Sequence, residues 1–261
     1  MVYRELPQPG FVRFMIDTTE VVCSKHVAEA VIEALRAGTL YRYAASHPSA
    51  RPLTGRGVAY AVLLPGNVER VVVRHNRHGG MLARFTGDLF RAPTLAPLEL
   101  RTSERLRRAG VPTPVILGYV VYAAPAGFRR VDVMTREIPE SRDLSSAIMT
   151  DDRQLRDNAL RATAGLVAAL SNAKARHHDL NVKNVLLHAA DDGSVAAAVL
   201  DVDRVEFVDD VAHARAANVA RLLRSARKWQ TIHGAPVTDE ELEAFADAVD
   251  ARRSRLASTL S

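Results

Sequence analysis

The sequence predicts an α+β protein built in two parts, and three observations support this prediction. Strand-like segments gather in the first half, whereas apolar residues in the second half recur mostly at helical spacing. The chain has 261 residues, 48% of them hydrophobic and 25% charged, which is typical of a globular protein with one or two domains. We therefore expect one domain over 1–137 and another over 138–261, with a ligand cleft between them.

The first part is predicted to be mostly strands. A turn at Pro65-Gly66-Asn67 joins two apolar runs, and a helical pattern stops at Gly38. Residues 1–20 contain Pro7, Pro9 and Gly10 and are expected to be irregular. The expected elements are a helix over 25–37, strands over 58–64 and 68–74, a basic helix over 96–109, and strands over 115–123 and 128–136.

The second part is predicted to be mostly helical, with a small strand pair inserted. Its last helix should begin at Thr238, because Thr238 and Glu241 have the spacing of a capping box. The expected elements are a helix over 151–175, strands over 185–187 and 196–202 joined by a turn at 191–193, and two closing helices.

Charge and cysteine content exclude some classes of protein. The formal charge of +5 is compatible with nucleotides, nucleic acid, anionic lipid or acidic sugars. Cys23 is the single cysteine, so no intramolecular disulfide or cysteine-based metal cluster can form. The longest uncharged run, 115–128, is too short to span a bilayer, and the N-terminus does not resemble a signal peptide. We expect a cytoplasmic protein.

Three polar residues follow or precede apolar strands in a pattern suited to phosphoryl transfer. Asp179 and Asn184 stand at the two ends of a short polar loop, and Asp201 follows the apolar pair Val199-Leu200. One carboxylate can accept or orient a hydroxyl, while an amide oxygen and a second carboxylate can hold Mg²⁺ on nucleotide phosphates. The residues alone therefore favour a kinase-like reaction.

The sequence around these residues resembles that of a known family. The segment His177-His-Asp179-Leu-x-x-x-Asn184 is similar to the catalytic loop of protein kinases, and Asp201 stands where their metal-binding aspartate follows. In finer detail, Asp-Leu-Asn-x-x-Asn-Val-Leu-Leu followed by Leu-Asp-Val-Asp-Arg resembles the lipopolysaccharide kinases, most of all the branch that phosphorylates 3-deoxy-D-manno-octulosonic acid (Kdo).

Other segments carry the same resemblance in the same order, from about Gly55 to Arg204. The family's pattern is matched at 74–84, where Arg-His-Asn-Arg-His-Gly-Gly-Met-Leu-Ala-Arg stands, and again at 105–114 and 134–139. Two positions depart from it, because Asn76 and Val202 replace aromatic residues. These departures remove no catalytic group.

The resemblance implies a protein-kinase-like bilobal fold, with a small β-rich N-lobe and a reduced helical C-lobe. It also implies site residues, each at the position that matches the family's motif. Asp179 would be the catalytic base, Asn184 and Asp201 would bind magnesium, Arg74 would bind nucleotide phosphate, Glu99 would pair with Arg74, and Gly55 and Gly57 would form a turn over the phosphates.

The implied activity is ATP-dependent phosphorylation of a hydroxyl on the Kdo sugar of a lipid A precursor, with ATP and Mg²⁺. The acceptor would be anionic and lipid-linked, and no nucleic acid partner is expected. Such an acceptor fits a protein at the cytoplasmic face of the inner membrane. The arginines of the basic helix that would touch lipid head groups are Arg101, Arg105, Arg107 and Arg108.

Alternatives stay open on the sequence. The acceptor could be an aminoglycoside-type small molecule, another core sugar or a protein hydroxyl, since the residues for ATP and magnesium would be the same. The chain could also be a catalytically silent binding module with a kinase fold. A nucleic-acid binder would rest on the positive charge alone.

Three further features of the sequence are open to a structural or a functional interpretation. His177 is expected to brace the catalytic loop, and Asp203 is expected to have a structural role. Gly79 and Gly80, near Arg77 and Arg84, form a candidate anion site because glycines let backbone N–H groups approach an anion.

Overall fold

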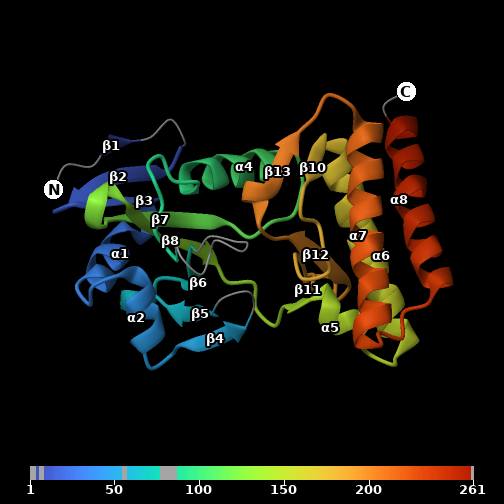
Figure 1. Cartoon of the computed structure of the whole chain (residues 1–261), viewed down its shortest axis with the longest axis horizontal. Coiled ribbons are helices and arrows are strands. Elements are labelled where there is room, and N and C mark those ends of the chain that lie inside the picture. Colours follow the sequence, from blue (N-terminus) through green and yellow to red (C-terminus); the bar gives the residue numbers. More distant parts are fainter. Residues whose placement is uncertain (1–3, 6–8, 55–57, 77–86, 260–261) are drawn as a thin grey trace. The chain divides into compact units, whose positions relative to one another are not determined.

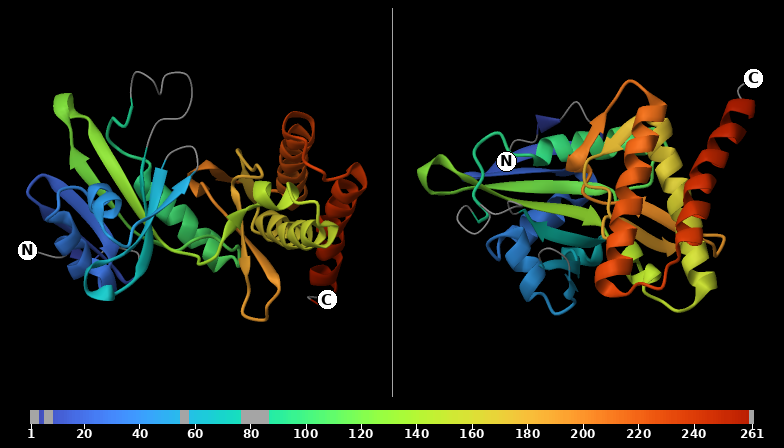
Figure 2. Two further views of the ribbon diagram at one scale, coloured as in Figure 1. Left: turned by 90° about the horizontal axis from the view of Figure 1, so that it is seen from below. Right: turned by 45° about the vertical axis from the view of Figure 1, so that its right-hand side comes forward.

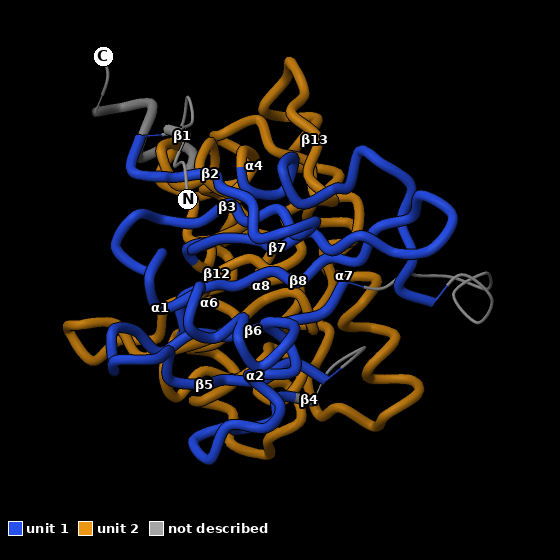
Figure 3. Tube along the Cα trace, turned by 90° about the vertical axis from the view of Figure 1, so that its left-hand side faces the viewer, with its two compact units in different colours: residues 1–100, 115–137 blue, residues 101–114, 138–261 orange. Residues whose placement is uncertain are grey.

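The computed structural model describes residues 4–5, 9–54, 58–76 and 87–259. Contacts divide the chain into two units (Figure 3). Unit 1 comprises residues 1–100 and 115–137, and unit 2 comprises residues 101–114 and 138–261. Gly55, Gly57 and the candidate anion site around Gly79-Gly80 lie outside the described residues.

Unit 1 contains an eight-stranded antiparallel sheet with the order β1-β2-β3-β7-β8-β6-β5-β4 (Figure 1). The strands expected from the sequence at 58–64, 68–74, 115–123 and 128–136 are confirmed as β5, β6, β7 and β8. The strand bounds are β1 Arg4–Glu5, β2 Phe11–Ile16, β3 Thr19–Ser24, β4 Arg51–Thr54, β5 Val58–Leu63, β6 Arg70–His75, β7 Ile116–Ala123 and β8 Arg129–Arg136.

The prediction that residues 1–20 are irregular was wrong. Within this stretch β2 pairs with β3, and β3 also pairs with the long strand β7. Asp17 turns the hairpin with a φ of 51°, a conformation that aspartate tolerates better than most residues. Five of the six residues of β2 are apolar, but the two prolines and the glycine before it favoured a loop.

Helices cover both faces of this sheet. The face with α1 and α2 buries Val71 and Val73 of β6, whereas the face with α4 buries Val131 and Val133 of β8. Because side chains alternate along a strand, Arg74 lies on the α4 face and His75 on the α2 face. The helices associated with unit 1 are α1 Ala28–Leu35 and α2 Leu40–Ser46, together with the first turns of α4 Ala96–Arg108.

Unit 2 combines helices, including the later turns of α4, with two small sheets. The helices α7 and α8 each pack against α6 (Figure 2). One sheet has the order β12-β11-β9 and the other pairs β10 with β13. The bounds are α5 Leu144–Ile148, α6 Arg153–Asn172, α7 Val211–His233, α8 Asp239–Thr259, β9 Arg142–Asp143, β10 Ala175–His177, β11 Val185–Ala189, β12 Val195–Val199 and β13 Val205–Phe207.

The start of α8 confirms the predicted capping box. The Thr238 N–H donates to Glu241 Oε2 at 2.6 Å, and the Glu241 N–H donates to Thr238 Oγ1 at 3.2 Å. Glu241 also forms a buried ion pair with Arg156 of α6, with Nη2 3.0 Å from Oε1. The cap of one helix is thereby tied to the core of another.

The predicted strand over 196–202 was partly wrong. Its ladder ends at Val199, and Asp201 adopts a left-handed conformation with a φ of 53°. That conformation ends a strand, so Val202–Arg204 instead forms a single 3₁₀ turn, η4. Across the described ranges, none of the helices is long and apolar enough to cross a membrane.

Candidate active site

The loop between β10 and β11 presents Asp179. The side-chain amide of Asn184 donates to the Asp179 carbonyl at 2.8 Å, and the Asn181 amide donates to the same oxygen at 3.0 Å. The Asn184 N–H also donates to the Asn181 carbonyl at 2.9 Å. These bonds close the loop into a tight turn that brings its two ends together, as the sequence predicted for Asp179 and Asn184.

His177 fixes this loop to the segment that precedes Asp201. Its Nδ1 accepts a hydrogen bond from the Asp179 N–H at 3.1 Å, and its Nε2 donates to the Leu200 carbonyl at 2.9 Å. An acceptor at Nδ1 and a donor at Nε2 define one neutral tautomer. Burial lowers the pKa of His177, which also favours the neutral ring. The expected bracing role of His177 is confirmed.

Asn184 and Asp201 lie at neighbouring ends of β11 and β12. The Leu200 N–H donates to the Asn184 carbonyl at 2.9 Å, so the residue before Asp201 is hydrogen-bonded directly to Asn184. Because the Asn184 side-chain nitrogen donates to Asp179, its Oδ1 is the atom left to accept or to bind a cation. Amide and carboxylate oxygens are ligands that Mg²⁺ prefers, so these residues fit that ion.

This pair of oxygen ligands would not by itself saturate a metal. Among the residues that the structure describes, no group of three or more histidine, cysteine, aspartate or glutamate side chains gathers as a metal site. Magnesium commonly takes one or two protein ligands, and substrate phosphates and water complete its octahedron.

Helix α7 supports the catalytic loop along one face, which the sequence analysis did not anticipate. Asn218 Oδ1 accepts from the His177 N–H at 2.9 Å, and its Nδ2 donates to the Ala175 carbonyl at 2.8 Å. Arg221 Nη2 lies 3.2 Å from Asp179 Oδ1. A signal was present, because Asn218 is a polar residue within an otherwise apolar stripe of a helix.

Unit 1 brings together Arg74 and Glu99, which the resemblance had paired. The guanidinium of Arg74 forms an ion pair with the Glu99 carboxylate and donates from Nη1 to Asn76 Oδ1 at 2.6 Å. The side chain of Glu99 is 6% exposed and that of Arg74 is 33% exposed. Arg74 is thus anchored from two sides while part of its guanidinium reaches solvent. Asn76, a departure from the family's pattern, is one of the two anchors.

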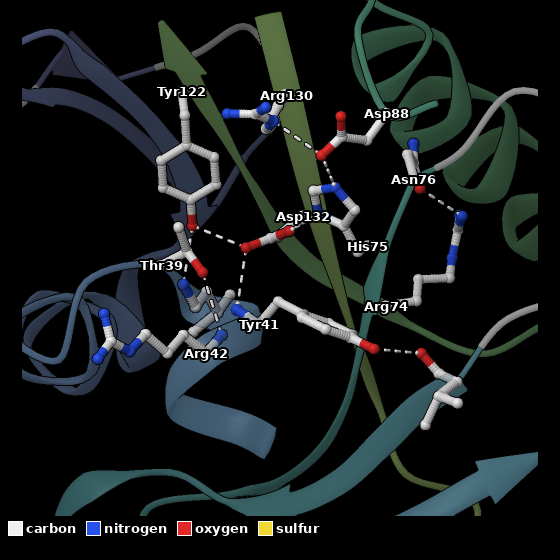
Figure 4. Close-up of polar contacts among 12 residues, drawn as sticks. Thr39, Tyr41, Arg42, Arg74, His75, Asn76, Asp88, Tyr122, Arg130 and Asp132 are labelled. Carbon is white, nitrogen blue, oxygen red and sulfur yellow. Dashed lines mark hydrogen bonds and ion pairs between the residues drawn. The ribbon is translucent and has the colours of Figure 1, made fainter. Parts of the chain in front are cut away.

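His75 lies on the opposite face of β6, at the centre of a charge network that is buried at Asp132 and partly exposed at Asp88 (Figure 4). Its Nδ1 donates to Asp132 Oδ1 at 2.6 Å and its Nε2 donates to Asp88 Oδ2 at 2.9 Å. His75 and Asp132 are direct cross-strand partners in β6 and β8. Asp88 is held in turn by Arg130, with Nε 2.7 Å from Oδ2.

Asp132 ties this network to helix α2. Its Oδ2 accepts from the Tyr41 N–H and the Tyr122 hydroxyl, each at 2.9 Å, and the same hydroxyl accepts from the Leu40 N–H at 2.8 Å (Figure 4). The two carboxylates facing the ring, with the bond to Asp132 the larger influence, raise the pKa of His75. His75 therefore carries its charge inside the sheet, on the same strand as Arg74 and directly after it in the chain.

The chain matches the model of the lipopolysaccharide kinase (Kdo/WaaP) family over residues 50–248. The chain belongs to this family. That match covers more than half of the sequence and includes Arg74, Glu99, Asp179, Asn184 and Asp201. The family resemblance drawn from the motifs is confirmed.

Curated relatives agree with the family assignment. A 3-deoxy-D-manno-octulosonic acid kinase of Actinobacillus succinogenes is 30% identical over 161 residues, covering 60% of this chain and 65% of the relative. One from Pasteurella multocida is 28% identical, covering 46% of this chain and 51% of the relative. A kinase of the same name from Vibrio cholerae is 26% identical over 197 residues, covering 74% and 78%. The chain thus spans about two thirds and half of the first two relatives.

A solved structure confirms the fold. The structure described as WaaP in complex with acyl carrier protein is similar with a TM-score of 0.51 at 16% identity, covering 82% of this chain and 83% of that one. The predicted α+β, protein-kinase-like fold class is therefore confirmed. The roles assigned to individual site residues, and the choice of acceptor, remain predictions.

Proposed function

We propose that this protein is an ATP-dependent kinase that phosphorylates a hydroxyl of the Kdo sugar on a lipid A precursor. The observation that carries the proposal is the hydrogen-bonded arrangement of Asp179, Asn184 and the segment before Asp201, in a chain of this family. The acceptor comes from the relatives, which are named for 3-deoxy-D-manno-octulosonic acid. The reaction class comes from the residues and the family together.

In the proposed reaction the acceptor's hydroxyl oxygen attacks the γ-phosphorus of ATP. A new phosphorus–oxygen bond forms while the bond to the bridging oxygen of ADP breaks, and the hydroxyl proton passes to Asp179 and then to solvent. The loop bonds from Asn181 and Asn184 go to the Asp179 backbone, so they hold its position without using its carboxylate. That arrangement suits a residue that must accept a proton.

We propose that Asn184 and Asp201 would hold Mg²⁺ through their side-chain oxygens, and that Arg74 binds a phosphate of ATP. When bound, the ion would neutralise charge on the transferring phosphates. Glu99 and Asn76 restrain the guanidinium of Arg74, which lowers the entropy lost when it binds phosphate. Gly55 and Gly57 are proposed to turn over the phosphates, from their match to the family alone.

The proposal is tested by mass spectrometry of a Kdo-capped lipid A precursor incubated with the protein, ATP and Mg²⁺. The wild type should add one phosphate. The Asp179→Asn variant should transfer about 10²- to 10⁴-fold more slowly, because it lacks a proton acceptor in the right place. Near-normal transfer by this variant would contradict the role of Asp179, and transfer only to other hydroxyl compounds would contradict the acceptor.

A matched pair of variants tests the proposed metal ligand. Asp201→Asn should remove most of the Mg²⁺-dependent transfer, because it replaces an anionic ligand with a neutral one. Asp203→Asn is the control, since Asp203 lies in the same short turn and contacts Arg204 at 3.5 Å. The Mg²⁺ concentration that gives half-maximal transfer should rise strongly for the first variant and little for the second. Equal shifts would contradict the assignment of Asp201.

We also propose peripheral contact with an anionic membrane through α4. Arg101 and Arg107 of this helix are exposed, whereas Arg105 stacks on Phe207 at 3.5 Å and Arg108 pairs with Glu104. The double variant Arg101→Gln/Arg107→Gln should float less with phosphatidylglycerol vesicles than the wild type does. Flotation that is absent in the wild type, or unchanged in the variant, would contradict this contact.

A further inference from the structure

Arg221 of α7 makes an ion pair with the residue proposed as the catalytic base. Its Nη2 lies 3.2 Å from Asp179 Oδ1, with the arginine side chain 42% exposed and the aspartate 28% exposed. The Nε of Arg221 is buried and has no hydrogen-bond partner among the described residues. The side chain of Arg221 therefore combines a buried, unpartnered Nε with a surface that solvent reaches.

The position of Arg221 is set by a register between α7 and the catalytic loop. Asn218, Arg221 and Ser225 share one face of the helix because they are spaced by three and four residues. Asn218 is fully buried and bonds to the backbone of His177. Ser225 Oγ accepts from the Val182 N–H at 3.2 Å, so the loop is held to α7 on both sides of Asp179.

A stabilising role explains this ion pair poorly. Exposed pairs of this kind contribute little to stability, because solvent screens them and side-chain entropy opposes them. The pair also occupies an oxygen of the carboxylate that must face the acceptor hydroxyl. An arginine in this position opposes proton transfer to Asp179 unless another anion takes over the guanidinium during the reaction.

We propose that Arg221 binds the carboxylate of the acidic sugar acceptor, and that this exchange of partners frees Asp179 Oδ1 for the hydroxyl. This inference rests on the proposed function. An arginine recognises a carboxylate through two parallel N–H donors, and such charge-assisted bonds are stronger than neutral ones. A neutral sugar would leave Arg221 on Asp179, so the same residue would select acidic acceptors over neutral ones.

The test compares two acceptors, the methyl glycoside of Kdo and the methyl ester of that glycoside. For the acid, Arg221→Ala should raise the acceptor KM about 10- to 100-fold. For the ester, the wild type should show a similar penalty and Arg221→Ala should add little to it. Arg221→Lys should lie between the two, and the KM for ATP should stay unchanged. Arg224→Ala, an exposed arginine one turn along α7, is the matched control.

Three results would overturn the inference. Equal losses for the acid and the ester in Arg221→Ala would mean that Arg221 acts through Asp179 alone, and the pH profile of kcat/KM would then shift alike for both acceptors. A raised KM for ATP would assign Arg221 to a nucleotide phosphate. An unchanged acceptor KM would leave it without a part in acceptor binding.

A binding measurement with the two sugars tests this inference independently of the proposed function. If the wild type transfers phosphate to neither sugar nor to the Kdo-capped lipid A precursor, the proposed function fails, and the affinities of the acid and the ester are compared by NMR titration of the protein. A preference for the acid that disappears in Arg221→Ala would support the carboxylate site. The absence of that preference in the wild type, or its survival in the variant, would overturn it.

Discussion

His75 of unit 1 and His177 of unit 2 are both nearly buried, yet they are held in opposite charge states. The side chain of His75 is 14% exposed and faces carboxylates at both ring nitrogens. His177 is 1% exposed and faces a backbone N–H and a backbone carbonyl. Burial disfavours the charged imidazolium in both, but only the first has anions that offset this cost.

The difference shows that carboxylate partners can outweigh the cost of burying a charged imidazole, whereas burial prevails where such partners are missing. It also suits the two proposed roles. Unit 1 presents a cationic Arg74, and the charged His75 beside it is neutralised on the far face of the sheet. Unit 2 presents Asp179 and Asp201, and a neutral His177 braces them without adding a cation that would compete for their carboxylates.

The largest effect is expected from breaking the unit 1 network at its buried end. Asp132→Ala should lower the free energy of unfolding by about 3–5 kcal/mol, because it leaves a charged His75 and the Tyr122 hydroxyl without their buried acceptor. The matched control is Asp88→Ala, at the partly exposed end of the same ring, which should cost about 1 kcal/mol. Chemical denaturation with hydrogen exchange at β8 measures both. Equal losses would mean that burial does not distinguish the two ends.

A smaller effect is expected from His177, because its bonds are neutral. His177→Ala should cost about 1–3 kcal/mol, since it leaves the Asp179 N–H and the Leu200 carbonyl unpaired. It should also lower kcat more than it raises the KM for ATP, because the loop and the Asp201 segment lose their common anchor. Glutamine can donate and accept at once, so His177→Gln should recover part of the loss. A change in the KM for ATP alone would contradict this role.

The two histidines should give opposite dependences of stability on pH. The pKa of His75 is raised, so its contribution is present below about pH 6.5 and is lost as pH rises through the folded pKa. The pKa of His177 is lowered, so its contribution is present above about pH 6.5 and is lost as pH falls through the folded pKa.

Hydrogen exchange in each unit from pH 5 to pH 8 measures these two trends. The groups that face His75 are Asp132 of β8, Asp88 and the ring of Tyr41 of α2, whose centroid is 5.6 Å away. His75→Gln should remove the trend in unit 1 and His177→Gln the trend in unit 2. Trends of the same sign would contradict the opposite charge states.

The smallest effect is expected where Arg74 keeps a hydrogen bond but loses a charge partner. Glu99→Gln should raise the KM for ATP only a few-fold, because Asn76 still holds the guanidinium. Glu104→Gln, on the same helix and paired with the exposed Arg108, is the control and should change nothing measurable. Steady-state kinetics at varied ATP concentration measures the KM of both variants. A loss as large as that of Arg74→Ala would make Glu99 the dominant anchor.

The elements that the sequence predicted well have strong, local patterns. The strand at 70–75 contains three successive β-branched valines and ends at polar residues. The start of the helix at 239–259 is marked by the capping residues Thr238 and Glu241. The hairpin over 11–24 was missed, because the prolines and the glycine before it favoured a loop, and its first strand is apolar without alternation. The short elements α2, α5, β9, β10 and β13 were also not anticipated, since such short segments form through their tertiary neighbours.

The sequence by itself determined the family, the fold class and the candidate groups for phosphoryl transfer, because closely spaced motifs carry their own chemistry. The tertiary structure decided what surrounds those groups. Asp132 is 57 residues from His75, and Arg221 is 42 residues from Asp179. Nothing local in the chain encodes such pairs. They form because sheet pairing and helix packing bring distant residues within hydrogen-bond distance, where burial and charge then set the chemistry of each side chain.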